Sequence, residues 1–353
     1  MGKETQTGWP MPSQPRPIVA VGAGGIQRDA HLPAYRAAGF EVAGVTDPGR
    51  ARAEALAAEF GIGRVFDDLG AAVAAFGAGA VYDLATPPGA IAEVLEALPE
   101  GATVQIQKPM GADLEEARRI RDLVRDRGLI AKVNFQLRFA PMMLAAARMI
   151  REGAIGTLTE IEAQVNVFTP WHMFPFLKGT ERLEIALHSI HYLDLIRAVA
   201  GEPRGVFCRS LPDPRSEGYA QTRTSAILDY GPDLRALINT GHNHRGGARF
   251  QVAQFRFEGT KGEMIARLGV LHDYPNGAPD ALWITQGGDS WQEVPLGGNW
   301  FPEAFAGSMA HVQRFAAGED DRLISSAEDA FATMALVEAC YTANDAPGTP
   351  IPD

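Results

Sequence analysis

Pro17-Ile-Val-Ala-Val-Gly-Ala-Gly-Gly-Ile-Gln27 is the stretch that decides the fold of this chain of 353 residues. Its first five residues form a continuous apolar run, which is typical of a strand buried on both faces of a parallel sheet. The glycines that follow predict a tight turn, and His31 to Ala38 favour a helix. Asp47 ends a second predicted strand, about 20 residues after Gly25. A strand, a glycine turn, a helix and an acid in this order predict a dinucleotide-binding fold.

The glycine turn has a chemical purpose in such a fold. Gly22 permits the sharp turn, and Gly24 lets the backbone approach a pyrophosphate at a helix N-terminus. The third glycine or alanine of the usual pattern is replaced by Gln27. Asp47 suits hydrogen bonds to both adenosine ribose hydroxyls and repels a 2′-phosphate, so we expect NAD. NADP is the alternative, because two arginines follow Asp47 closely. The residues expected to contact the cofactor in this region are Gly22, Gly24, Gly25, Ile26, Gln27 and Asp47.

A second stretch, Gly101-Ala-Thr-Val-Gln-Ile-Gln-Lys-Pro-Met110, predicts a strand that ends on a lysine. Pro109 ends it because proline cannot donate a hydrogen bond to the next strand. Ligands of α/β sheets bind at the carboxyl ends of strands, which makes Lys108 a candidate site residue. A surface lysine that merely ends a strand is the alternative interpretation.

The order of predicted elements indicates two domains. Strands and helices alternate as far as residue 135, which predicts a doubly wound parallel sheet. We therefore expect a flexible N-terminal tail over 1–16, an NAD(P)-binding Rossmann domain over 17–135, and a second α/β domain over 136–353, for which the family resemblance given below implies substrate binding and oligomerisation. In that last domain, the alternation of apolar and polar residues over 156–168 predicts a long strand of an antiparallel sheet. The other predicted strands of this α/β domain cover 205–210, 222–229, 235–240, 250–258 and 282–286.

Composition excludes several classes of protein. Hydrophobic residues make up 46% of the chain and charged residues 21%, so a sizeable core is expected. A net charge of -11 without a basic cluster argues against nucleic-acid binding. Cys208 and Cys340 are far apart in the sequence and predict neither a disulfide framework nor a thiolate metal site. No apolar run approaches the length of a signal peptide or a membrane span, so a cytoplasmic protein is expected.

Glu184-Ile-Ala-Leu-His-Ser-Ile-His-Tyr-Leu-Asp194 is the second stretch with chemical potential. On a helix, His188 and His191 lie one turn apart, with Glu184 or Asp194 within a turn of one of them. A carboxylate beside a histidine suits proton transfer. A structural histidine pair and a metal site are the two other interpretations.

Two further stretches carry candidate residues. Phe168 to Phe176 is dense in aromatic side chains, and Trp171 is a candidate wall of a substrate pocket, or else part of a packed loop. In Gly241-His-Asn-His-Arg245, an extended backbone would place His242 and His244 on one face. That spacing can bind zinc, but it is more often a strand end or a pocket lining, and we expect no metal.

Five motifs stand in a fixed order along the chain: Val21-Gly-Ala-Gly-Gly-Ile26, Thr86-Pro-Pro88, Gln107-Lys-Pro109, Arg138-Phe139 and His191-Tyr-Leu-Asp194. Together they resemble the motifs of the Gfo/Idh/MocA oxidoreductases. The resemblance covers nearly all of residues 17–345. It implies an N-terminal Rossmann domain, a C-terminal domain with a large open antiparallel sheet, and a homodimer or homotetramer formed through that sheet. It also implies an NAD(P)-dependent dehydrogenase or reductase acting on a secondary alcohol of a sugar, cyclitol or related polyol.

The resemblance also implies roles for individual residues. Lys108 and His191 would flank the reacting hydroxyl, with His191 as the acid and base and Lys108 as the orienting charge. The resemblance and the sequence together place substrate contacts at His188, Trp171, Arg138 and Asp194. Further cofactor contacts are expected at Thr86, Pro87, Gln107 and Lys108.

The chain departs from the family pattern at three positions: Gln107 replaces a glutamate, Ile91 a histidine and Leu187 an aspartate. These departures concern the identity of the substrate more than the type of reaction. Two alternatives to a dehydrogenase stay open. One is a nucleotide-binding sensor without turnover, and the other is an NAD-assisted glycosidase or lyase without net redox change.

Overall fold

The computed structural model describes residues 8–274 and 276–352. The chain forms two compact units. The first contains Gly8–Pro141 and Trp300–Met334, and the second contains the described residues of 142–299 and 335–352. Helix α9 (Ala327–Asp345) begins in the first unit and ends in the second.

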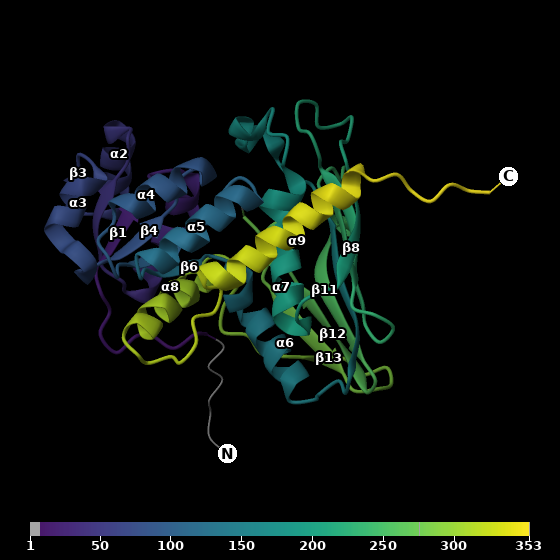
Figure 1. Ribbon diagram of the computed structural model, residues 1–353. Coiled ribbons are helices and arrows are strands. Elements are labelled where there is room, and N and C mark those ends of the chain that lie inside the picture. The colour runs from purple at the N-terminus through teal and green to yellow at the C-terminus, as the bar shows by residue number, and fades with distance from the viewer. Residues whose placement is uncertain (1–7, 275, 353) are drawn as a thin grey trace, which may run out of the picture. The chain divides into compact units, whose positions relative to one another are not determined.

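The first unit is built around a six-stranded sheet in which every neighbouring pair is parallel (Figure 1). The strand order is β3-β2-β1-β4-β5-β6, so the chain returns to the centre of the sheet between β3 and β4. This order is that of a doubly wound dinucleotide-binding fold, which confirms the predicted fold class. The strands are β1 (Ile18–Val21), β2 (Val42–Thr46), β3 (Val65–Phe66), β4 (Val81–Leu84), β5 (Thr103–Ile106) and β6 (Ile130–Val133).

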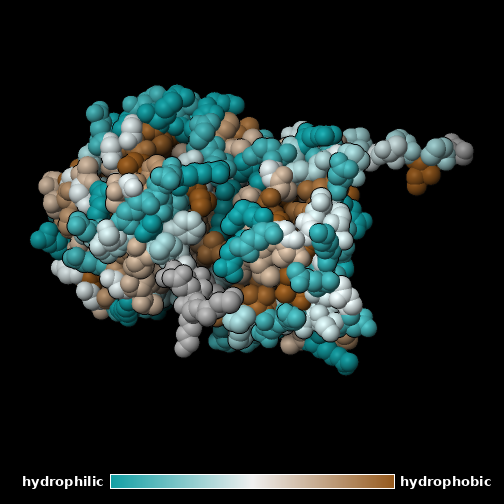
Figure 2. Space-filling model, turned by 90° about the horizontal axis from the view of Figure 1, so that it is seen from below, coloured by the Kyte–Doolittle hydropathy of each residue, from teal (hydrophilic) through white to brown (hydrophobic). Residues whose placement is uncertain are grey.

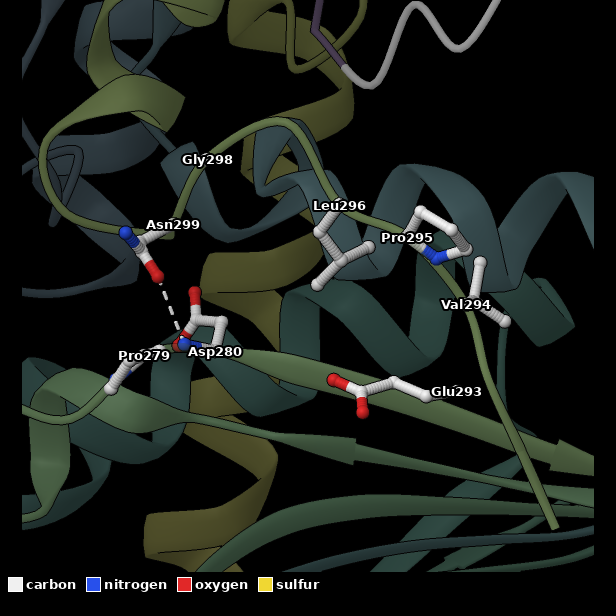
Figure 3. Close-up of a pocket in the computed structure, with 8 residues that line it drawn as sticks. All are labelled: Pro279, Asp280, Glu293, Val294, Pro295, Leu296, Gly298 and Asn299. Atoms are coloured by element: carbon white, nitrogen blue, oxygen red, sulfur yellow. Dashed lines mark hydrogen bonds between the residues drawn. The ribbon is translucent and has the colours of Figure 1, made fainter.

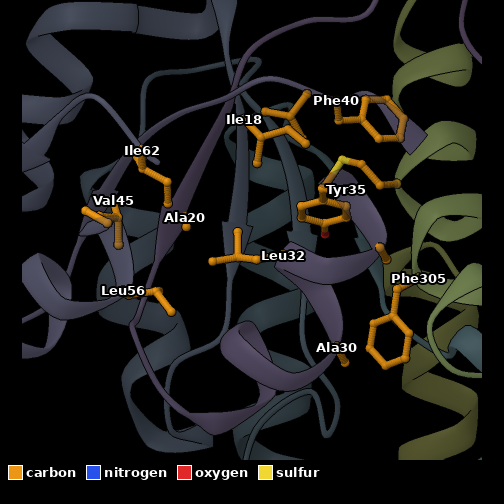
Figure 4. Close-up of a cluster of buried hydrophobic side chains, with 14 of the residues drawn as sticks. Ile18, Ala20, Ala30, Leu32, Tyr35, Phe40, Val45, Leu56, Ile62 and Phe305 are labelled. Atoms are coloured by element: carbon orange, nitrogen blue, oxygen red, sulfur yellow. The ribbon is translucent and has the colours of Figure 1, made fainter. Parts of the chain in front are cut away.

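Helices connect successive strands of this sheet and bury its apolar side chains. Both β1 and β4 are buried along their whole length, as the continuous apolar run of β1 predicts. One buried apolar cluster contains Ile18 of β1, Tyr35 of α1 and Phe305 of a later helix (Figure 4). The connecting helices are α1 (Leu32–Ala38), α2 (Arg50–Phe60), α3 (Leu69–Phe76), α4 (Ile91–Ala97) and α5 (Leu114–Asp126).

The first unit extends beyond the predicted Rossmann boundaries of 17–135. Helix α8 (Glu303–Ala316) packs against β5, β6 and α1, although the sequence pattern assigned it to the second domain. Residues 8–16, predicted as a flexible tail, are held against the same helix: the Trp9 ring lies 4.7 Å from the His311 ring. The Arg16 N–H donates to the Gln313 side chain over 2.7 Å. Residues 1–7 of the predicted tail lie outside the described residues.

The second unit contains an eight-stranded sheet in the order β14-β13-β12-β11-β7-β10-β9-β8. All neighbouring pairs are antiparallel except β10 and β7, which confirms the predicted, mostly antiparallel sheet. Two of its strands, β12 and β14, had no counterpart in the sequence prediction. The strands are β7 (Leu158–Asn166), β8 (Gly205–Leu211), β9 (Arg223–Asp229), β10 (Arg235–Gly241), β11 (Val252–Gly259), β12 (Gly262–Arg267), β13 (Ala281–Thr285) and β14 (Gln292–Glu293).

One face of this sheet is covered by helices, as Figure 1 shows. The covering helices are α6 (Pro141–Arg151), α7 (Ile190–Ala200) and the second half of α9. Buried and exposed residues alternate strictly along β9, so its other face meets solvent. Phe255 on β11 contributes to the covered side, where its ring lies 5.8 Å from that of Tyr192 on α7.

The surface agrees with the charged composition of the chain. Figure 2 shows hydrophilic side chains over much of one face of the molecule, interspersed with smaller apolar areas. Among the described residues, no helix has both the length and the apolar character that crossing a bilayer requires.

Candidate active site

The glycine turn after β1 is shaped by close approach of two strands. Gly22 has φ +100°, and a Cβ there would lie 2.5 Å from the carbonyl oxygen of Ala85, which follows β4. Only glycine therefore fits this position. Gly24 is exposed, and a Cβ there would meet no atom within 4 Å. The turn thus combines one tightly packed glycine with an open stretch of backbone at the start of a helix.

Asp47 at the end of β2 is nearly buried and organises this turn. Its carboxylate accepts hydrogen bonds from the backbone N–H of Ala23 over 2.8 Å and of Gly49 over 2.6 Å. The exposed Arg52 guanidinium donates to the same carboxylate over 2.6 Å. These hydrogen bonds hold the carboxylate in place where an adenosine ribose is expected.

Gln27 is placed differently from the usual pattern. It begins a π-helical turn, η1 (Gln27–His31), just before α1. Its side chain is fully buried, and its amide nitrogen donates to the Asp83 carboxylate over 3.1 Å. The same carboxylate bonds His31 over 2.8 Å and Tyr35 over 2.9 Å. The Gln27 amide nitrogen therefore belongs to a buried polar network, whereas its Oε1 atom is buried without a hydrogen-bond partner among the described residues.

Residues after β4 and β5 complete the same edge of the sheet. The Thr86 Oγ1 atom is buried without a hydrogen-bond partner among the described residues. Gln107 is 9% exposed, and its side-chain oxygen accepts a hydrogen bond from the Lys108 N–H over 3.2 Å. The carboxyl ends of parallel strands lie at one edge, so these residues share it with Gly22 and Asp47. Open glycine backbone, an ionised acid and a buried hydroxyl without a partner fit a dinucleotide.

Lys108 lies two residues after the end of β5 and is joined to Pro109 by a cis peptide bond. Its side chain is only partly exposed. Removal from solvent disfavours the ammonium form and lowers the pKa of Lys108 to about 8. A lysine with this pKa can hold a positive charge at neutral pH and can lose its proton within reach of physiological conditions.

His188 and His191 lie on one helix of the second unit, but its hydrogen-bond pattern is not regular. A π-helical turn, η7 (Ile185–Ser189), leads directly into α7. His188 is half-buried in this turn, and His191 in the first turn of α7 is 7% exposed. A π turn inside a helix is rare and often accompanies a functional site.

Glu184 begins this helix, is fully buried and faces His242, which follows β10. Its carboxylate lies 3.3 Å from His242 Nε2 and accepts hydrogen bonds from the Ser189 hydroxyl over 2.9 Å. Burial opposes the charge on Glu184, but hydrogen bonds and the attraction of His242 outweigh it, and the pKa of Glu184 is lowered. The rings of His188 and His242 lie 4.5 Å apart.

Trp171 lies beside both histidines, in the aromatic segment after β7. Its ring centroid is 6.1 Å from that of His188 and 5.9 Å from that of His242. The indole N–H donates to the Asn243 side chain over 3.2 Å, and the Tyr219 ring lies 4.6 Å away. These contacts fix the indole in place next to the histidines.

Two predicted substrate contacts have other partners in the structure. Arg138 lies in the first unit and donates to Asp329 over 2.7 Å. Asp194, 1% exposed, lies 3.9 Å from Arg197 on the next turn of α7. Both positions stay predictions as substrate contacts.

A separate hollow in the second unit contains no predicted site residue (Figure 3). It is lined in part by Asp280, Glu293 and Asn299. The Asp280 N–H donates to the Asn299 side chain over 2.9 Å, and the Asp280 carboxylate accepts from the Gly269 N–H. These groups hold neighbouring loops together, so the hollow shows no arrangement of reactive side chains.

Sequence reasoning did not predict that His242 lies next to Glu184 and His188. His242 was considered only with His244, but His244 turns to the Gly247 carbonyl over 3.0 Å. His242 instead joins Glu184 and His188 from a strand end far along the chain. Parallel pairing of β10 with β7 places His242 beside Thr169 and Trp171, which follow β7. The contact of His242 with Glu184 joins residues 58 positions apart, which local sequence patterns do not reveal.

Comparison with known proteins gives the same family for both halves of the chain. Residues 17–135 match the model of the oxidoreductase family with an NAD-binding Rossmann fold, and residues 143–265 match the GFO/IDH/MocA C-terminal domain. The chain is 25% identical to D-apiose dehydrogenase of Paraburkholderia graminis, over 91% of this chain and 85% of that protein. It is 27% identical to 1,5-anhydro-D-fructose reductase of Ensifer adhaerens, over 85% of this chain and 90% of that protein.

A solved structure has a similar fold. An oxidoreductase from Agrobacterium radiobacter, in complex with NAD+, L-tartaric acid and magnesium, superposes with a TM-score of 0.77 at 21% identity. The alignment covers 94% of this chain and 96% of that one. Both family domains, the sheet order of each unit and the residues at the edge of the parallel sheet lead to one conclusion. The chain belongs to the Gfo/Idh/MocA family of oxidoreductases and has an NAD(P)-binding Rossmann domain.

Proposed function

We propose that this protein is an NAD(P)-dependent dehydrogenase or reductase that acts on a secondary alcohol of a sugar, cyclitol or related polyol. One observation carries the proposal: Gly22, Asp47, Thr86 and Lys108 each follow a strand of one parallel sheet by one or two residues, at its carboxyl edge. The residues suited to binding a dinucleotide thereby lie at the same edge of the sheet as Lys108, whose pKa is lowered to about 8. The names of the two sugar-specific relatives support the class of substrate.

We assign complementary roles to two side chains. A bound nicotinamide supplies the hydride acceptor or donor for the substrate carbon. His191 accepts the hydroxyl proton when the alcohol is oxidised and returns it when the ketone is reduced. Lys108, as an ammonium ion, orients the oxygen and stabilises the negative charge that develops on it. The family resemblance supports this division, as does the low exposure of His191.

The substrate contacts we propose in the second unit are Trp171 and His188. The fixed indole offers an apolar surface for the C–H face of a polyol, and the adjacent imidazole offers hydrogen bonds to its hydroxyls. Arg138 and Asp194 are retained as further candidates, although each already has an ionic neighbour.

We propose NAD as the preferred cofactor. Asp47 presents an ionised carboxylate that suits two ribose hydroxyls and repels a 2′-phosphate. Arg52 offsets part of this repulsion, since it donates to the same carboxylate. Reduction rates with NAD⁺ and NADP⁺ at equal concentration measure the preference directly.

The proposed activity is tested by incubating the purified protein with either cofactor and a panel of aldoses, inositols, sugar acids and anhydrosugars. We expect reduced-cofactor absorbance with one class of substrate, and its loss in Lys108→Ala. Tight cofactor binding without reduction would favour the sensor. Substrate consumption without net reduced cofactor would favour the NAD-assisted glycosidase or lyase.

We also propose a homodimer or homotetramer formed through the uncovered face of the eight-stranded sheet. Phe207, Ile227 and Leu237 occupy neighbouring positions on β8, β9 and β10. Phe207 is 71% exposed and Ile227 is 53% exposed. An apolar row of this kind on a sheet face favours burial against another surface.

A further inference from the structure

Glu184, His188 and His242 form a side-chain cluster, of which the proposed function uses only His188, as a substrate contact. Each offers one potential ligand atom, and the three atoms lie within 4.8 Å of one another. Glu184 and His242 are buried and His188 is half-buried. Two imidazoles and one carboxylate are a ligand set that zinc uses at sites with a fourth, open position.

We propose that Glu184, His188 and His242 bind one zinc ion in the second unit. The inference goes beyond the proposed function and does not depend on it, since the ion would bind in the absence of cofactor and polyol. It also differs from the sequence expectation of no metal, which considered His188 with His191 and His242 with His244.

The surroundings of the cluster hold its members as metal ligands are usually held. His242 Nδ1 lies 3.0 Å from the Thr169 hydroxyl, which leaves Nε2 directed at the Glu184 carboxylate. Ser189 and Thr224 donate to that carboxylate from other directions. Hydrogen bonds of this kind fix the orientation of ligating histidines and carboxylates.

Charge gives a second argument. Glu184 is fully buried, and the cluster places the two histidines close to its carboxylate. A buried carboxylate requires a compensating positive charge. A divalent cation between Glu184 and two neutral imidazoles supplies that charge without protonating either ring.

Rigidity gives a third argument. Trp171 stands edge-on to both imidazoles and is itself held by Asn243 and Tyr219. The π turn η7 contains His188 and begins directly after Glu184, so these two ligands come from one short, unusual segment. An aromatic wall limits ring rotation and water access, both of which favour a defined ion site.

Imidazole nitrogens select the type of ion. Magnesium and calcium prefer oxygen ligands, whereas zinc accepts nitrogen and oxygen together. The remaining coordination position of a tetrahedral site would hold water, or a hydroxyl of a bound polyol. His191 lies one turn further along the same helix, so the ion would border the substrate region proposed for this unit.

The test measures zinc bound to the full-length protein after treatment with a chelator and removal of that chelator. Titration with zinc chloride against a fluorescent zinc indicator should give one tight equivalent per chain. Glu184→Gln and His242→Gln should lose that equivalent. His244→Gln is the matched control, since His244 lies two residues away on the same segment and bonds the Gly247 carbonyl instead.

Thr169→Val keeps the proposal testable if the buried substitutions prevent folding. It preserves side-chain shape and removes only the hydroxyl beside His242, so zinc affinity should fall by about 10- to 100-fold. Cobalt bound to the wild type should show the intense visible spectrum of a tetrahedral site. Absence of a tight equivalent in the wild type, or its retention in His242→Gln, would overturn the proposal. The zinc measurements are independent of the reduction of NAD, which is measured separately.

Discussion

At the scale of single residues, the chemistry depends on the charge of Lys108. Its pKa is lowered to about 8 because the surrounding protein removes water from the ammonium group. The neighbouring Gln107 is neutral and 9% exposed, so it supplies no charge to oppose that effect. Activity that requires the ammonium form should therefore decline as the pH rises through about 8.

Replacing Gln107 by glutamate should move that decline to higher pH. A carboxylate next to the ammonium stabilises the protonated form and raises the pKa of Lys108. The measurement is the pH profile of kcat/KM, which reports groups of the free enzyme. Gln107→Met is the control, since it keeps the length of the side chain without a charge. A profile of Gln107→Glu that coincides with that of the wild type would contradict the role of Lys108.

At the scale of elements, two substitutions in the glycine turn distinguish its effect on folding from its effect on cofactor binding. Gly22→Ala should destabilise the first unit, because φ is +100° and the new Cβ would meet the Ala85 oxygen at 2.5 Å. Gly24→Ala should leave the melting temperature nearly unchanged, because a Cβ there meets no atom within 4 Å. It should nevertheless weaken NAD binding, because the methyl group occupies space that the pyrophosphate needs. Thermal unfolding and cofactor titration of both variants check this pair; equal affinity of Gly24→Ala and the wild type would remove the turn from the cofactor site.

The N-terminal segment offers a second test at this scale. Trp9 packs its ring 5.2 Å from Phe139 and 4.7 Å from His311 of α8. Trp9→Ala should lower the free energy of unfolding by about 2 kcal/mol, less than a fully buried tryptophan would. Trp291 is 44% exposed, and Trp291→Ala serves as the control with little expected effect. Equal unfolding curves for the wild type and Trp9→Ala would show that residues 8–16 behave as the flexible tail first predicted.

The elements that the sequence predicted and those it missed differ in a physical way. β1 was predictable because a strand buried on both faces leaves a continuous apolar run. α8 escaped prediction because it is buried on nearly all sides and includes Ser308, His311 and Gln313, so no apolar stripe stands out. The π turns η1 and η7 are equally invisible, since hydrophobic periodicity gives no signal for a single widened turn.

The residues of the candidate site likewise include some that the sequence predicted and some that it did not. Gly22, Asp47 and Lys108 could be placed because each follows a strand in a local motif whose geometry is general. The contact between Glu184 and His242 could not be predicted, because the two residues are 58 positions apart and belong to different elements. Non-local pairing leaves no trace in local sequence patterns.

At the scale of the whole molecule, the exposed row on the eight-stranded sheet predicts association between chains. Phe207→Asp places a charge in the row formed with Ile227 and Leu237, and it should shift the protein toward monomers. The measurement is the molar mass by light scattering over a range of concentrations. Phe250→Asp is the control, since Phe250 is 65% exposed but lies outside this row. A mass unaffected by Phe207→Asp would place any interface elsewhere.

The central claim, hydride transfer from a polyol carbon, is tested most directly by isotope transfer. The substrate found by the panel is labelled with deuterium at the reacting carbon, and both products are examined by mass spectrometry. The account predicts that wild-type protein moves the deuterium to the reduced nicotinamide and leaves an unlabelled ketone, whereas Lys108→Met transfers it far more slowly. Deuterium that stays in the sugar product or is released to water, without labelled reduced cofactor, would contradict the proposed dehydrogenase.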